Sequence, residues 1–331
     1  MTIAEPVYNR RNNHHPTGHL QQGTPDRVPG ERPPPGETTA SETPLNYRHA
    51  YHAGNFADVI KHALLAALIG ALRRKATPFA VLDTHAGIGA YDLSGPQAQA
   101  TGEWRDGIGR LLETSPDAPD LAPLQPWLTI VRDTIRAHHG KLVYPGSPEL
   151  VAKLLRPGDT LTCCELHPED QRSLRSLFRN NQAVSVHARD GYSALTAFLP
   201  PRTAKRGLTL MDPPFEQGDE FARLADAIVT ARTRFPGGIV AAWYPIKHRA
   251  PPRAFLNRLK DAGQRNLLTA ELTLRPPLDP TRLNGCGLLI ANPPWQFEDE
   301  ARSILSALRP YLAEDETETS VEWAVEWVAP E

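Results

Sequence analysis

The chain has 331 residues, 40% of them hydrophobic, and a formal net charge of −2, which allows one large domain or two ordinary ones. Its three cysteines, Cys163, Cys164 and Cys286, are too few for a disulfide framework, and the adjacent pair lacks the spacing of a zinc site. Because the sequence contains no apolar run of about 18 residues and no apolar secretory signal, we expect a cytoplasmic protein without a membrane contact.

Residues 1–44 have the composition of a tail. They hold eight Pro, four Gly and a single aromatic residue, Tyr8, and they show no apolar period. Such a segment cannot bury enough surface to offset the entropy lost on ordering it. We therefore predict a disordered, Pro-rich tail at 1–44 and a folded domain over 45–331.

From residue 45 onward, helical stretches alternate with short apolar strands. A helix is predicted from about Asn55 to Lys75, with an apolar stripe along one side, and the strand after it ends at Asp83. Further strands are predicted at Leu161–Glu165, Val184–Ala188, Leu208–Met211, Ile239–Trp243, Leu268–Leu274 and Leu288–Ala291. Helices are expected between most of them, near 168–180, 217–233 and 252–263. This alternation predicts an α/β fold with a mostly parallel sheet covered on both faces. The alternating segment VEWAVEWV at 321–328 predicts a half-buried antiparallel strand near a sheet edge.

The first two predicted strands are unusually far apart. They end at Asp83 and Glu165, whereas a simple βαβ unit needs about 30 residues. The excess contains enough apolar residues for a small helical insertion at about 100–155. A sharp turn is expected at 144–148, followed by a helix capped near Ser147.

Acidic residues and glycines follow four of the predicted strands. These groups are Asp83 with its glycine-containing turn DTHAGIG, Glu165, Asp190 with Gly191, and Asp212 in DPPF. Ligands bind beyond the carboxyl ends of parallel strands, so these residues should meet at one site. Glu165 can accept both hydroxyls of a ribose, and Asp190 can accept an adenine amino group.

The same turn separates two classes of cofactor. A nicotinamide dinucleotide site needs G-x-G-x-x-G, and this chain has Asp92 where the third Gly would stand. S-adenosylmethionine has no phosphate and carries a sulfonium cation, which suits an acid-lined pocket better. The pattern favours S-adenosylmethionine over a nicotinamide enzyme.

DPPF at 212–215 matches the needs of amino-group methylation. An exocyclic amine is a poor nucleophile, and acceptors at the Asp212 carboxylate and the Pro213 carbonyl would stabilise the nitrogen as it becomes positive. Asp212 would then accept the amino proton, and Phe215 offers a face for stacking an extruded base. A second Pro-Pro element, NPPW at 292–295, is interpreted as structural or as a wall of the substrate cleft.

The segment LNYRHAYHAGNFADVIKH at 45–62 is dense in bases and polar aromatics, which suits phosphate contact and base stacking. It lacks the spacing of a metal-binding helix, so no metal site is predicted.

These motifs together resemble a known family. YRHAYHAGNFADVIKH, FAVLDTHAGIGAY, YPGSP, ELHP, RDG, MDPPF, WYPI and NPPW, in this order, resemble the ribosomal RNA large subunit methyltransferase J family over about residues 45–331. The resemblance implies a Rossmann-like class I S-adenosylmethionine-dependent methyltransferase sheet with a small helical insertion. It also implies methylation of adenine N6 in 23S ribosomal RNA, which the family modifies at adenine 2030.

The resemblance further implies roles for individual residues. Asp212 would be the catalytic acceptor. The methyl donor would be contacted by His62, His85, Ser147, Glu165, Asp190 and Gly191. Tyr47 is similar to the family's RNA contact, with His49 and Lys61 as supporting candidates beside Phe215. The family usually has Tyr where Phe215 stands, so stacking is retained there without a hydroxyl group.

Two other functions remain open at this point. A DNA adenine-N6 or cytosine-N4 methyltransferase would use the same Asp-Pro-Pro-aromatic chemistry. A non-catalytic RNA-binding protein could keep the fold, although the intact acids Asp212, Glu165 and Asp190 count against it. We expect a monomer, because no long exposed apolar seam is evident in the sequence.

Overall fold

The computed structural model describes residues 48–313 and 321–330. The tail predicted at 1–44 lies outside these residues, which all belong to the compact unit Leu45–Glu331. No helix in the described ranges is both long and apolar enough to cross a membrane.

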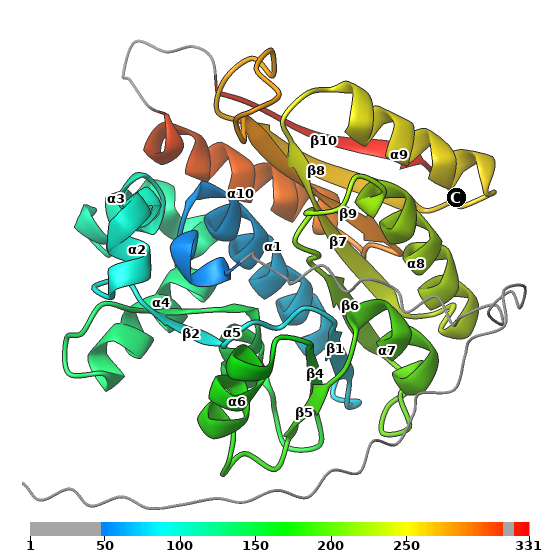
Figure 1. The fold of residues 1–331 in the computed structure, drawn as a ribbon, viewed down its shortest axis with the longest axis horizontal. Coiled ribbons are helices and arrows are strands. Elements are labelled where there is room, and N and C mark those ends of the chain that lie inside the picture. The colour runs from blue at the N-terminus through cyan, green and yellow to red at the C-terminus, as the bar shows by residue number, and fades with distance from the viewer. Residues whose placement is uncertain (1–47, 314–320, 331) are drawn as a thin grey trace, which may run out of the picture. The chain divides into compact units, whose positions relative to one another are not determined.

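A mixed sheet of eight strands forms the centre of this unit (Figure 1). Its strand order is β10-β8-β9-β7-β6-β1-β4-β5. The strands are β1 (Ala80–Asp83), β4 (Thr160–Glu165), β5 (Val184–Ala188), β6 (Gly207–Met211), β7 (Ile239–Ile246), β8 (Leu267–Thr273), β9 (Gly285–Ala291) and β10 (Glu322–Ala329). A separate antiparallel pair joins β2 (Ala90–Asp92) to β3 (Val143–Pro145).

Strand direction divides the sheet into two parts. Neighbouring strands from β5 through β4, β1 and β6 to β7 run parallel. On the other side, β9 is antiparallel to β7 and β8, and β10 is antiparallel to β8 at the sheet edge, as predicted for 321–328. The chain order reverses between β1 and β6, which is the position where open α/β sheets bind ligands.

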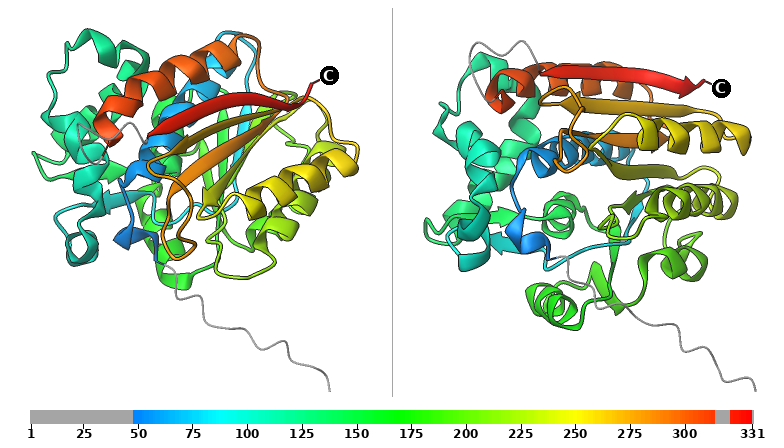
Figure 2. Two further views of the ribbon diagram at one scale, coloured as in Figure 1. Left: turned by 90° about the horizontal axis from the view of Figure 1, so that it is seen from above. Right: turned by 45° about the horizontal axis from the view of Figure 1, so that its top comes forward.

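Helices cover both faces of the sheet (Figure 2). The helical segments are η1 (His49–Tyr51), α1 (Phe56–Arg73), α2 (Pro96–Thr101), η2 (Glu103–Asp106), α3 (Ile108–Glu113), η3 (Pro119–Leu124), α4 (Gln125–Ala137), α5 (Ser147–Leu154), α6 (Pro168–Leu177), α7 (Gly191–Phe198), α8 (Glu220–Arg234), α9 (Ala250–Asp261) and α10 (Phe297–Leu312). One core lies beneath α1, α5, α6 and α10, and a second lies beneath α7, α8 and α9. The predicted Rossmann-like α/β sheet is confirmed.

Helix α1 is buried on nearly all sides. It begins after Asn55, whose side chain accepts hydrogen bonds from the backbone N–H groups of Ala57 and Asp58. The predicted single apolar stripe was too narrow, because α4, α5 and α10 pack around the helix as well. As a result, Asp58, Lys61 and His62 are polar residues inside a buried helix.

The long connection between β1 and β4 contains helices α2 to α4 and the β2–β3 pair. These helices have their own buried side chains, among them Ile108, Leu111, Trp127 and Leu128. Helix α5 instead packs against β1 and β4 and belongs to the layer that covers the sheet. The helix start predicted near Ser147 is confirmed: Gly146 is the N-cap of α5, and Ser147 is its first helical residue.

Candidate active site

The acidic residues singled out from the sequence meet at the carboxyl ends of the parallel strands. Asp83 and Glu165 are the last residues of β1 and β4, and Asp212 directly follows β6. These three strands are parallel neighbours, and Asp190 follows β5 beside them. The predicted convergence of four strand ends is therefore present.

Glu165 is oriented by backbone donors. Its Oε2 accepts the N–H of Gly87 at 2.8 Å, and its Oε1 accepts the N–H of His167 at 2.7 Å. Gly87 has a φ of +61°, and a Cβ there would stand 2.2 Å from the hydroxyl of Tyr91. Glycine is thus required at this turn, where its backbone reaches the carboxylate. Burial raises the pKa of Glu165, whereas the two N–H donors lower it.

The start of α7 packs directly on the turn after β1. A Cβ on Gly191 would lie 2.4 Å from the carbonyl oxygen of Thr84 and 2.8 Å from the His85 ring. Asp190 is the N-cap, and its Oδ1 accepts the N–H of Ser193 at 2.8 Å. Burial lowers the pKa of His85 to about 4, so its imidazole is neutral at pH 7. This corner has no room for an added side chain at Gly191.

Asp83, the last residue of β1, lies beneath the same strand ends and is fully buried. Its Oδ2 accepts the hydroxyl of Ser147 at 2.7 Å, and its Oδ1 accepts the N–H of His85 at 3.3 Å. Burial, together with the nearby charge of Asp212, raises the pKa of Asp83 to about 7. The Ser147 hydroxyl therefore donates its hydrogen bond to Asp83 and does not cap the start of α5.

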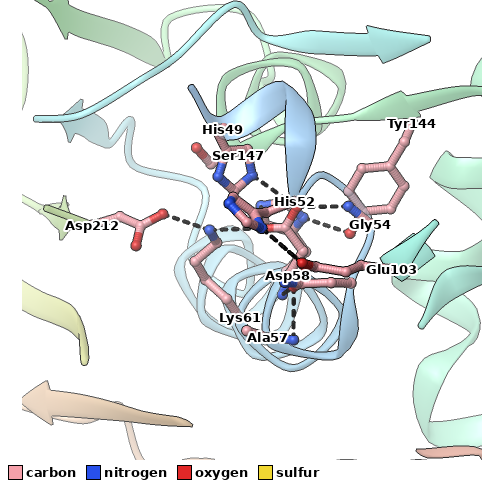
Figure 3. Close-up of polar contacts among 12 residues, drawn as sticks. His49, His52, Gly54, Ala57, Asp58, Lys61, Glu103, Tyr144, Ser147 and Asp212 are labelled. Atoms are coloured by element: carbon pink, nitrogen blue, oxygen red, sulfur yellow. Dashed lines mark hydrogen bonds and ion pairs between the residues drawn. The ribbon is translucent and has the colours of Figure 1, made fainter. Parts of the chain in front are cut away.

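Asp212 belongs to a chain of charged side chains that runs into α1 (Figure 3). Its Oδ2 lies 2.5 Å from the Lys61 ammonium, which also contacts Asp58 Oδ1 at 2.8 Å. Asp58 Oδ2 in turn contacts His49 Nε2 at 2.9 Å and accepts the N–H of Gly54 at 2.9 Å. The other oxygen of Asp212, Oδ1, has no hydrogen-bond partner within the described part of the chain, and the side chain is 16% exposed.

His62 lies beside this chain but carries no charge. Its Nδ1 is 2.7 Å from the Tyr144 hydroxyl, and both side chains are about 1% exposed. Burial lowers the pKa of His62 to about 3. His62 is therefore placed under the site as a neutral hydrogen-bonding group.

Phe215 forms an aromatic cluster beside Asp212. Its ring makes edge contacts with Phe221 at 4.8 Å and with Trp243 at 5.8 Å between centroids, and it remains half-buried. Its φ of +52° is rare for a residue with a side chain. Strain of this kind persists where the surrounding structure holds a side chain in a particular direction.

The second Pro-Pro element, NPPW, does not belong to this site. It follows β9, whose last residue Ala291 pairs with Val240 near the start of β7. NPPW consequently lies at the amino ends of the parallel strands, whereas DPPF lies at their carboxyl ends. The Asn292 amide donates to the carbonyls of Pro236 and Gly238, and Trp295 is 79% exposed. The structural interpretation remains, and a role as a wall of this cleft is wrong.

Comparisons with known proteins agree with this geometry. Residues 76–327 match the family model described as "Ribosomal RNA large subunit methyltransferase D, RlmJ". Ribosomal RNA large subunit methyltransferase J of Escherichia coli is 38% identical over 87% of this chain and all of its own length. The Haemophilus influenzae protein of the same name is 36% identical over 87% of this chain and its full length.

The chain belongs to the ribosomal RNA large subunit methyltransferase J family.

A crystal structure from Legionella pneumophila agrees with the fold of this family member. It is 34% identical, has a TM-score of 0.74, and the match covers 83% of this chain and 98% of that one. The resemblance recognised from the motifs is confirmed.

The structure adds residues to this family member's site that sequence reasoning did not select. Asp58, Tyr144 and Trp243 lie beside Lys61, His62 and Phe215, respectively. The contact of Asp58 with Lys61 could have been predicted from the sequence, because residues three apart on a helix face the same way. Tyr144 had none, since it approaches His62 from a strand 82 residues away.

Three of the four predicted RNA contacts lie in the described ranges. His49 is partly exposed and Phe215 is half-buried, whereas Lys61 is only 4% exposed and is turned toward Asp212. Tyr47 lies outside the described residues. Within 48–313 and 321–330, no group of three His, Cys, Asp or Glu side chains is arranged to hold a metal ion.

Proposed function

We propose that this protein transfers a methyl group from S-adenosylmethionine to N6 of an adenine in the 23S RNA of the large ribosomal subunit. The observation that carries the proposal is the Asp212 carboxylate at the end of β6, held through Oδ2 by Lys61 and, among the described residues, without a hydrogen-bond partner at Oδ1. The family membership and the names of its relatives support the RNA substrate.

The residues at this edge suit S-adenosylmethionine. Glu165 and Asp190 present acidic side chains, while His62 and His85 are held neutral by burial and add no positive charge. Gly191 has no Cβ, so the start of α7 packs directly on Thr84 and His85 and its backbone stays accessible to the donor. Glu165, already oriented by two N–H donors, is suited to accept the ribose hydroxyls.

Bound S-adenosylmethionine supplies an electrophilic methyl group on a sulfonium centre. Asp212 Oδ1 and the Pro213 carbonyl accept the two N–H groups of the target amine, which orients its lone pair away from them. As the nitrogen becomes positive, the negative charge of Asp212 stabilises it. Asp212 then takes the surplus proton, and Phe215 stacks on the base.

The test is transfer of labelled methyl from S-adenosylmethionine to protein-free 23S RNA, with DNA and protein offered as competing acceptors. Digestion to nucleosides should place the label in N6-methyladenosine from the RNA alone. Label in DNA would instead identify a DNA amino-methyltransferase. If the protein binds the donor but transfers to no acceptor, including assembled large-subunit particles, the enzymatic proposal is wrong.

Replacing Glu165 with Gln should weaken binding of S-adenosylhomocysteine about 10- to 100-fold, measured by calorimetry. The amide would present a donor to the N–H of Gly87 or of His167, and hydrogen bonds to a charged group contribute about 1.5–3 kcal/mol. Glu113→Gln, an exposed change on α3, should leave the affinity unaltered. Equal affinity in Glu165→Gln would exclude Glu165 from the donor site.

Replacing Phe215 with Ala should lower kcat/KM for RNA about 10- to 100-fold at saturating donor, because stacking contributes about 1–3 kcal/mol per base. Phe215→Tyr keeps the ring and should retain most of the activity. The affinity for S-adenosylhomocysteine should not change in either variant. A Phe215→Ala variant with unaltered RNA kinetics would rule out stacking on this ring.

A further inference from the structure

Asp58 is a buried carboxylate to which the mechanism above gives no part. It is 1% exposed and lies on α1, one turn before Lys61. Three groups approach it within hydrogen-bond distance: the Lys61 ammonium, the His49 imidazole and the Gly54 N–H. A carboxylate this deep is costly unless it is paired, so its partners decide what it does.

The charges around Asp58 show that it is ionised. Burial by itself would raise the pKa of Asp58, but His49 and Lys61 hold it well below its usual range. Burial would likewise lower the pKa of Lys61, and the carboxylates of Asp212 and Asp58 hold it well above its usual range. Two carboxylates therefore share one ammonium, with Lys61 Nζ 2.8 Å from Asp58 Oδ1 and 2.5 Å from Asp212 Oδ2.

This sharing has a consequence for catalysis. A single Lys61–Asp212 pair would be neutral and would offer little to a nitrogen that becomes positive. Asp58, Lys61 and Asp212 have charges −1, +1 and −1, which leaves one net negative charge among these three groups. His49 contacts Asp58 at the end of the series away from Asp212, and it adds a positive charge there only when its ring is protonated. The excess is available next to Asp212 Oδ1, where the proposed function places the target amine.

We propose that Asp58 is a positioning residue for methyl transfer, which neutralises Lys61 so that Lys61 can hold Asp212 without cancelling its charge. The inference rests on the proposed function, because it assigns Asp58 a part in the same reaction. Asp58 also ties His49, in the segment similar to the family's RNA contact, to the same ammonium. One buried carboxylate thus links the N-terminal segment to the catalytic aspartate.

The experiment compares Asp58→Asn, Lys61→Met and the double variant with the wild type, all assayed for methyl transfer to 23S RNA. Asp58→Asn should lower kcat about 10- to 100-fold, with KM for RNA and donor affinity within about twofold of wild type. Lys61→Met leaves the carboxylates of Asp58 and Asp212 without the cation between them and should lower kcat further. The double variant restores the net charge of −1, so its kcat should exceed that of Lys61→Met alone.

Asp159→Asn is the matched control. Asp159 is 2% exposed, accepts the N–H of Phe79 and pairs with Arg156, but it precedes β4 at the opposite edge of the sheet. Both single Asn variants should lower the Tm, and only Asp58→Asn should lower kcat per donor-binding molecule. The inference is overturned if Asp58→Asn keeps the wild-type kcat, or if the double variant is no more active than Lys61→Met. A wild type that transfers no methyl group would overturn the proposed function as well.

Discussion

Replacing Asp212 with Asn should abolish methyl transfer, lowering kcat by about 10³-fold or more, while the affinity for S-adenosylhomocysteine stays within about twofold. A general base contributes about 10²- to 10⁴-fold, and Asp212 has the added task of stabilising the positive nitrogen. The Asn oxygen would turn to the Lys61 ammonium, which now lies 2.5 Å from Oδ2. Its NH₂ group would then face the target amine, and two donors cannot bond to each other.

Single-turnover transfer to 23S RNA measures this loss without interference from product release. Asp226→Asn, an exposed change on α8 where Asp226 pairs with Arg258, is the control and should behave as wild type. Retention of activity in Asp212→Asn would mean that the DPPF carboxylate neither accepts the proton nor stabilises the nitrogen.

The free energy of unfolding should fall by about 4 kcal/mol between pH 4 and pH 8 because of Asp83 alone. Burial raises the pKa of Asp83 to about 7 in the folded protein, whereas an unfolded Asp titrates near about 3.9. The folded state thus favours the neutral acid, so the contribution is fully present below the unfolded pKa. It is lost as the pH rises through about 7, and about three pKa units correspond to about 4 kcal/mol.

Urea unfolding of the wild type and Asp83→Asn over this pH range isolates the effect. Asn cannot ionise, so the stability of the variant relative to the wild type should improve steadily from pH 4 to pH 8. Asp133→Asn, an exposed change on α4, should keep a constant difference from wild type. A constant difference for Asp83→Asn would show that Asp83 is already ionised at low pH in the folded protein.

Most of the sheet could be predicted because its strands are short apolar runs bounded by polar residues. The limits predicted for β5 agree with the structure to the residue, and those for β4 and β6 within one. The direction of β9 could not be predicted, since a fully buried strand is equally apolar whichever way it runs. Because the direction of β9 was unknown, NPPW could be predicted as a neighbour of DPPF, whereas in the structure it lies at the opposite ends of the strands. Helix α10 was also missed, although Phe297, Ala301, Leu305 and Leu308 recur on one face of it.

The site was predictable wherever a residue follows a strand, and less so where partners come from elsewhere. Glu165, Asp190 and Asp212 each follow a predicted parallel strand, and this position alone predicts that they lie together at the carboxyl ends of the sheet. Lys61 was different: beside histidines and tyrosines its charge suggested RNA contact, but its main partner Asp212 is 151 residues away. Only the tertiary structure brings that pair together.

The inserted helices are interlocked with the segment that precedes α1. Gly107 approaches so closely that a Cβ there would lie 2.2 Å from the carbonyl of Gly54, which accepts the N–H of Ile108 at 2.9 Å. Glu103 contacts His52 and accepts from the Asn55 amide, both at 3.0 Å. Two stretches separated by about 50 residues therefore pack together and are held by hydrogen bonds to each other. In a chimera between family members, grafting the insertion without the matching N-terminal segment would break this fit, so the two must be exchanged together.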